Sequence, residues 1–171
     1  MIISERLSEY IKALECDLPE YLDELEQRAL ADEVPIIRKE AQSLLRFLLC
    51  LLKPEKILEV GCAVGFSSAF MSEYMPENCT ITTIEKVEMR IKEAKKNLAR
   101  IPKADKVTLI CGDALDVLKE LSEQGETYPF IFMDGILPND PAVRKTRHFT
   151  DAPSESIPSV RNVGCFTDKL P

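Results

Sequence analysis

The chain has 171 residues, of which 45% are hydrophobic and 30% are charged. This length and composition are typical of one soluble globular domain, and they exclude collagen-like, mucin-like and wholly disordered chains. The longest apolar stretch, residues 44–52, is interrupted by Arg46 and is far too short to span a membrane, so we expect no membrane partner. The first residues lack the basic and apolar regions of a signal peptide, which makes a cytoplasmic location the default expectation.

The charge is negative overall and unevenly distributed. There are 29 acidic and 22 basic residues, and the net charge of −7 disfavours broad binding of nucleic acid, because phosphate groups need a positive surface. We interpret the basic residues 86–106 as the solvated face of a helix, or alternatively as a local patch for an anionic substrate. These bases are Lys86, Arg90, Lys92, Lys95, Lys96, Arg100, Lys103 and Lys106.

The cysteines do not indicate a metal site. No two of the six are spaced as C-x-x-C, and His148 is the single histidine, so a structural zinc site is not expected. We interpret the cysteines as small buried thiols. They are Cys16, Cys50, Cys62, Cys79, Cys111 and Cys165.

Helices are expected in the first third of the chain. Apolar residues at helical spacing predict a helix over residues 3–15 and another over about 38–52. Between them, Asp17 is expected to cap a helix with Pro19 in its first turn and Glu20 completing a capping box. Val34-Pro35 should end or follow that helix.

After residue 55, short apolar runs alternate with helical stretches. This alternation predicts an α/β fold in which right-handed βαβ units form a parallel sheet with helices on both faces. The expected strands are residues 56–60, 80–84, 107–110 and 130–133, and the expected helices are residues 66–75, 87–100 and 113–121.

Four groups are expected at the carboxyl ends of these strands, where open α/β sheets bind ligands. Small residues at Gly61, Ala63 and Gly65 allow a tight turn between the first strand and its helix. Glu85 ends the second strand, where an acid can accept hydrogen bonds from ribose hydroxyls. Gly112-Asp113 ends the third strand and Asp134 the fourth. The alternatives are turn glycines without a ligand, helix-capping acids at 85 and 113, and a turn acid at 134.

The loop narrows the choice of ligand. The dinucleotide fingerprint G-x-G-x-x-G is not met, because Ala63 and Phe66 occupy two of its glycine positions. The phosphate-binding loop G-x-x-x-x-G-K-[ST] is also absent. The remaining possibility is a nucleoside ligand that needs no phosphate-binding loop. S-adenosylmethionine is such a ligand.

Residues 59–67, Glu-Val-Gly-Cys-Ala-Val-Gly-Phe-Ser, resemble the E-[IV]-G-[TC]-x-x-G-[YF]-S loop of the class I O-methyltransferases related to caffeoyl-CoA O-methyltransferase. The resemblance covers about residues 3–134, and the N-terminal helices are similar to the bacterial branch that methylates 5-hydroxyuridine in tRNA. It implies a Rossmann-like methyltransferase fold. The other matching segments are residues 34–38, 81–85, 112–114 and 130–134.

The resemblance also implies a role for each matching residue. Glu59, Gly61, Ala63 and Gly65 would belong to the cofactor loop. The remaining roles are Ser67 at the methionine tail, Ile37 along the cofactor, Glu85 at the ribose hydroxyls, Asp113 and Ala114 at the adenine, and Asp134 at both the transferring methyl and a divalent metal.

The implied function is transfer of the methyl group of S-adenosylmethionine to a hydroxyl, on tRNA 5-hydroxyuridine or a small catechol-like compound. In this family a metal, usually Mg²⁺, binds the acceptor oxygen and lowers its pKa. A homodimer is also implied. Two alternatives stay open: a non-catalytic remnant that binds S-adenosylmethionine, and a nucleotide-binding or interaction domain without methyl transfer.

The resemblance ends after Asp134. Leu137 and Asp140 stand where the family has a lysine and a tyrosine, and Asp168-Lys169 stands where it has a metal-binding Asp-Asn pair. Asp168 is therefore a second predicted metal ligand. We interpret residues 1–134 as the methyltransferase domain, with helices in 1–52 and the βαβ core in 55–134. Residues 135–171 are interpreted as a poorly ordered tail foreign to the family, with the last strands of the sheet incomplete.

Overall fold

The computed structural model of the protein describes residues 17–134. Four parallel strands form one sheet in the order β3-β2-β1-β4. Because β1 lies between two neighbours, four of its five residues are buried, as expected for an inner strand of a parallel sheet. The strands are β1 (Lys56–Val60), β2 (Thr80–Glu85), β3 (Val107–Cys111) and β4 (Phe130–Met133).

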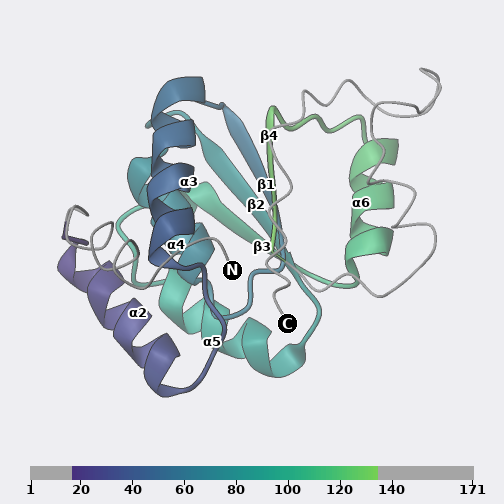
Figure 1. The fold of residues 1–171 in the computed structure, drawn as a ribbon. Coiled ribbons are helices and arrows are strands. Elements are labelled where there is room, and N and C mark those ends of the chain that lie inside the picture. The colour runs from purple at the N-terminus through teal and green to yellow at the C-terminus, as the bar shows by residue number, and fades with distance from the viewer. Residues whose placement is uncertain (1–16, 135–171) are drawn as a thin grey trace, which may run out of the picture.

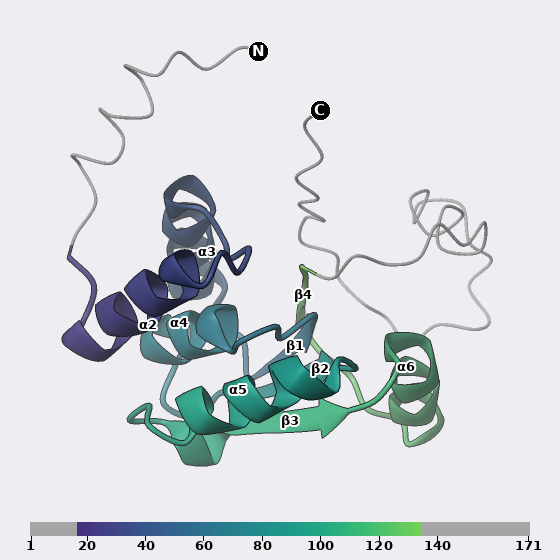
Figure 2. The same ribbon diagram turned by 90° about the horizontal axis from the view of Figure 1, so that it is seen from below.

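Helices cover both faces of the sheet (Figures 1 and 2), which confirms the predicted fold class. The larger core joins one face to four helices, and the smaller core joins the other face to α6. Figure 1 shows α6 to the right of the sheet, α2, α3 and α4 to its left, and α5 below it. The helices are α2 (Glu20–Ala31), α3 (Lys39–Leu52), α4 (Phe66–Tyr74), α5 (Glu88–Leu98) and α6 (Ala114–Glu123), with a short 3-10 helix, Ala104–Lys106, before β3.

One predicted helix start is wrong. Asp17 does not cap α2: Pro19 occupies the N-cap position, and no side chain caps the helix. The N–H groups of Leu22 and Asp23 donate instead to the Pro19 carbonyl, at 2.9 and 3.0 Å. Pro19 therefore precedes the first turn, and Asp17 lies too far upstream to serve as the cap. Val34-Pro35 follows the helix, as predicted.

The other predicted elements lie close to the observed ones. The largest differences are in α5, which runs from Glu88 to Leu98 within the predicted residues 87–100, and in α6, which runs from Ala114 to Glu123 against the predicted residues 113–121. The expected helix over residues 3–15 and the tail 135–171 lie outside the described residues. Within residues 17–134, no helix has the length and apolar character needed to cross a membrane.

The cysteines divide between the core and the surface. Cys62 and Cys79 are buried, as predicted, but Cys50 and Cys111 are exposed, so the prediction of buried thiols is wrong for that pair. Cys50 lies on the outer side of α3, and Cys111 ends β3 at the edge of the sheet. Cys16 and Cys165 lie outside the described residues.

Candidate functional site

The loop after β1 has an unusual backbone. Three of its residues have positive φ angles: Gly61 at 99°, Ala63 at 46° and Gly65 at 87°. Alanine rarely adopts this left-handed conformation, so contacts around the loop must hold Ala63 in place. The loop ends where α4 begins, with Gly65 as the N-cap.

The end of β2 holds the first part of this loop. The N–H groups of Gly61 and Cys62 both donate to the carbonyl of Ile84, at 3.0 and 3.2 Å. Within the loop, the Gly65 N–H donates to the Cys62 carbonyl at 2.8 Å. The loop is therefore a closed turn fixed to the neighbouring strand.

The carboxylate of Glu85 joins the loop to the start of α5. One oxygen accepts the Ala63 N–H at 2.8 Å, and the other accepts the N–H groups of Lys86 and Val87, both at 2.9 Å. Glu85 thus closes the turn before α5 but does not cap the helix, because Val87 is the N-cap and no side chain caps α5. A carboxylate offers about four acceptor positions, so after these three bonds Glu85 retains capacity for a ligand hydroxyl.

Glu59 lies beneath the loop and has no exposed surface. Ser68 and Thr83 donate hydrogen bonds to its Oε2, while its Oε1 is buried and has no hydrogen-bond partner among the described residues. Burial raises the pKa of Glu59, opposed by the hydroxyls of Ser67, Ser68 and Thr83, and the charge of Asp134 adds to the rise. Glu59 was predicted to contact the cofactor. In this structure its side chain lies below the surface of the loop.

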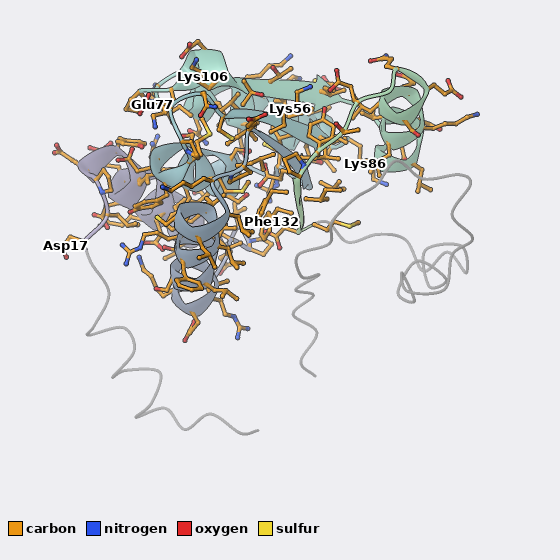
Figure 3. All side chains as sticks on the ribbon, turned by 90° about the horizontal axis from the view of Figure 1, so that it is seen from above. Asp17, Lys56, Glu77, Lys86, Lys106 and Phe132 are labelled. Atoms are coloured by element: carbon orange, nitrogen blue, oxygen red, sulfur yellow. The ribbon has the colours of Figure 1, made fainter. Side chains whose placement is uncertain are left out.

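Asp113 caps α6, and Ala114 is its first residue. The Leu115 N–H donates to Asp113 Oδ1 at 3.0 Å, and Lys86 Nζ lies 3.4 Å from Oδ2. The backbone hydrogen bond lowers the pKa of Asp113, and Lys86 lowers it further. Figure 3 shows Lys86 near α6. The contact between Lys86, which follows β2, and Asp113, which follows β3, joins the ends of these two strands at this edge of the sheet.

A hollow lies between the loop and the segment before α3. The Asp134 N–H donates to the Val60 carbonyl at 3.0 Å, so Asp134 continues the pairing of β4 with β1 and reaches the rim of this hollow. The hollow is lined by Pro35, Ile36, Ile37, Gly61, Cys62, Ala63, Val64, Phe66, Ser67 and Asp134.

The predicted site residues therefore form two groups. Ile37, Gly61, Ala63, Ser67 and Asp134 meet around the hollow, whereas Gly65 closes the loop behind it. Glu85, Asp113 and Ala114 lie at the ends of β2 and β3. The prediction missed five lining residues, all of which lie inside the segments that carried the resemblance: Pro35, Ile36, Cys62, Val64 and Phe66.

The described residues do not by themselves form a divalent-cation site. Across residues 17–134, no three His, Cys, Asp or Glu side chains are grouped to hold a metal ion. Asp134 contributes one carboxylate at the rim of the hollow. The other predicted ligand, Asp168, lies outside the described residues.

A family model described as O-methyltransferase matches residues 12–142. This chain belongs to the O-methyltransferase family. It is similar to the catechol O-methyltransferase of Niastella koreensis, with 32% identity over 95 residues that cover 55% of this chain and 43% of that protein. It is also similar to the catechol O-methyltransferase of Mycobacterium tuberculosis, with 31% identity over 116 residues that cover 66% and 51%. The chain thus spans about half the length of these O-methyltransferases.

The fold of this O-methyltransferase family member matches solved structures. One is the O-methyltransferase TomG of Streptomyces achromogenes, solved in complex with SAM, with a TM-score of 0.71 and 26% identity. The match covers 85% of this chain and 68% of that one. The predicted family and its Rossmann-like fold are therefore confirmed, while the tRNA-modifying branch stays a prediction.

Proposed function

We propose that this protein is an O-methyltransferase that transfers the methyl group of S-adenosylmethionine to a hydroxyl acceptor. Family membership supports the class of reaction. The observation that carries the proposal is the Glu85 carboxylate, which binds the loop at Ala63 and keeps acceptor capacity at the carboxyl end of β2. That combination suits a ribose beside a small-residue loop.

The residues of the site suit the parts of this cofactor. Glu85 would accept hydrogen bonds from the ribose hydroxyls, and Asp113 with Ala114 would lie along the adenine. Ser67, in the first turn of α4, would contact the methionine tail. No side chain caps α4, so its first N–H groups are available to a carboxylate, which the helix dipole also favours. Ile37 would contribute an apolar wall.

The proposed chemistry depends on alignment. When bound, S-adenosylmethionine supplies a methyl group on a positively charged sulfur. Asp134 at the rim of the hollow would orient the acceptor hydroxyl and accept its proton. Holding the two reactants in line provides much of the rate enhancement in such transfers.

We propose a small hydroxylated compound of the catechol type as the acceptor. The net charge of −7 disfavours a nucleic-acid partner. Several bases of the 86–106 segment are also engaged by acids, because Lys92, Arg90 and Lys103 pair with Glu88, Glu93 and Glu77. Methylation of tRNA 5-hydroxyuridine is the alternative acceptor reaction. Assistance by Mg²⁺, a homodimer and a cytoplasmic location stay predictions.

The test is a transfer assay with the full chain. S-adenosylmethionine with a labelled methyl group is incubated with catechol, or with tRNA that contains 5-hydroxyuridine, in Mg²⁺ and in a chelator. We expect label on catechol and a lower yield with Glu85→Ala. Cofactor binding without transfer to either acceptor would support the non-catalytic remnant instead. A folded protein that neither binds nor transfers would contradict the proposal.

A further inference from the structure

The loop at the site is held by one continuous part of the chain, residues 84–97. The Ile84 carbonyl and the Glu85 carboxylate hold Gly61, Cys62 and Ala63, as described above. The next residue of the loop, Val64, is held by a side chain that lies further along the chain. The side-chain amide of Asn97 donates to the Val64 carbonyl at 2.8 Å.

Asn97 lies in the last turn of α5, which packs beside α4 on the same face of the sheet (Figure 2). The next residue of that helix, Leu98, contacts the next residue of the loop, Gly65. A Cβ atom added at Gly65 would lie 3.1 Å from Leu98 Cγ. Two consecutive residues of α5 therefore contact two consecutive residues of the loop.

This contact falls where the loop backbone is least regular. Val64 lies between Ala63 at φ 46° and Gly65 at φ 87°. The left-handed conformation of Ala63 costs conformational energy, so the loop would relax if the neighbouring Val64 carbonyl lost its partner. The Asn97 amide favours the one orientation of the Val64 peptide that points its carbonyl toward α5.

We propose that Asn97 is a positioning residue for cofactor binding, a role that rests on the proposed function for the identity of the ligand. Asn97 does not line the hollow. It acts by holding the loop in its binding conformation before the ligand arrives. A ligand that must first order its loop binds more weakly, in proportion to the fraction of molecules in which the loop is already formed.

Two substitutions test this role. Asn97→Ala removes the donor. Asn97→Asp keeps the shape of the side chain but places a carboxylate against the Val64 carbonyl. We expect affinity for S-adenosylhomocysteine, measured by calorimetric titration, to fall roughly three- to tenfold with alanine and at least as much with aspartate. The matched control is Lys96→Ala, a neighbouring exposed residue of α5, which should change the affinity by less than about twofold.

Amide hydrogen exchange of the free proteins separates positioning from general destabilisation. In both Asn97 variants we expect faster exchange at the loop N–H groups of residues 61–65, with unchanged exchange in the middle of α4. Equal affinity for S-adenosylhomocysteine in the wild type and both variants would overturn the proposal. If the wild type itself fails to bind, the proposed function fails, and the exchange measurement still decides: unchanged loop exchange would overturn the role of Asn97.

Discussion

Single residues of the site combine structural and binding roles. Glu85 closes the turn before α5 and anchors Ala63 with the same carboxylate. Both roles depend on its position one residue before the turn into α5, which is visible in the sequence. The burial of Glu59 cannot be recognised in the sequence, because it depends on Ser68 and Thr83, which come from two other elements.

Gly65 has a left-handed backbone conformation in the loop and also packs against Leu98 of α5. Gly65→Ala should lower the free energy of unfolding by about 1–2 kcal/mol for the left-handed backbone and by about 1–3 kcal/mol more because Leu98 must move. Gly125→Ala is the matched control, since Gly125 has φ +74° and nothing within 4 Å of an added Cβ. Urea unfolding measures both. Equal losses in the two variants would contradict the packing of Leu98 against Gly65.

Glu59 gives the stability a specific dependence on pH. Burial raises the folded-state pKa of Glu59 above its ordinary value of 4.5, so the protonated form favours folding. The protonated carboxyl of Glu59 contributes fully to the free energy of unfolding below that ordinary pKa value. This contribution is lost as the pH rises through the folded-state pKa. The stability of wild type relative to Glu59→Gln, measured by urea unfolding, should therefore decrease as the pH rises from that ordinary value through the folded-state pKa.

The control for this pH dependence is Glu55→Gln, a change at an exposed residue that leaves the Glu59 carboxyl in place and should therefore keep the pH dependence that Glu59 causes. A constant difference between wild type and Glu59→Gln would show that Glu59 titrates alike in the folded and unfolded chains. That result would contradict the burial of its carboxyl group.

Among the secondary-structure elements, α3 has one face in the core and one on the surface. Leu49 has no exposed area, whereas Leu51 is 63% exposed. Leu49→Ala should lower the free energy of unfolding by about 2–5 kcal/mol, because it leaves a cavity in the larger core. Leu51→Ala should change it by no more than about 0.5 kcal/mol. Urea unfolding of the two variants measures the difference, and a large loss in Leu51→Ala would mean that the outer face of α3 is covered.

Local patterns predicted most of these elements. The β-branched run at residues 80–84 is sufficient to identify β2, and Asp113 is recognisable as the cap of α6 because its side chain needs only the next two residues. The wrong cap at Asp17 arose because Pro19 can stand either inside the first turn or just before it. The contact of Asn97 with Val64 spans 33 residues and has no local pattern, so the sequence alone could not reveal it.

For the whole molecule, the sheet order places the site. Because β1 lies between β2 and β4, the loop after β1 is next to the ends of both strands. This arrangement brings Glu85 to one side of the loop and Asp134 to the other. The sequence predicted a parallel sheet and residues at the strand ends, but the order of the strands follows from packing between distant segments.

Calorimetric titration of the full chain with S-adenosylhomocysteine tests most directly whether this edge of the sheet binds S-adenosylmethionine. We predict saturable binding that Glu85→Ala weakens by about 1–3 kcal/mol, as expected for the loss of a charged hydrogen bond. The exposed Glu88→Ala, at the start of α5, should bind like the wild type. A folded wild-type protein that releases no heat, or equal binding by the Glu85→Ala variant, would contradict the assignment of the site.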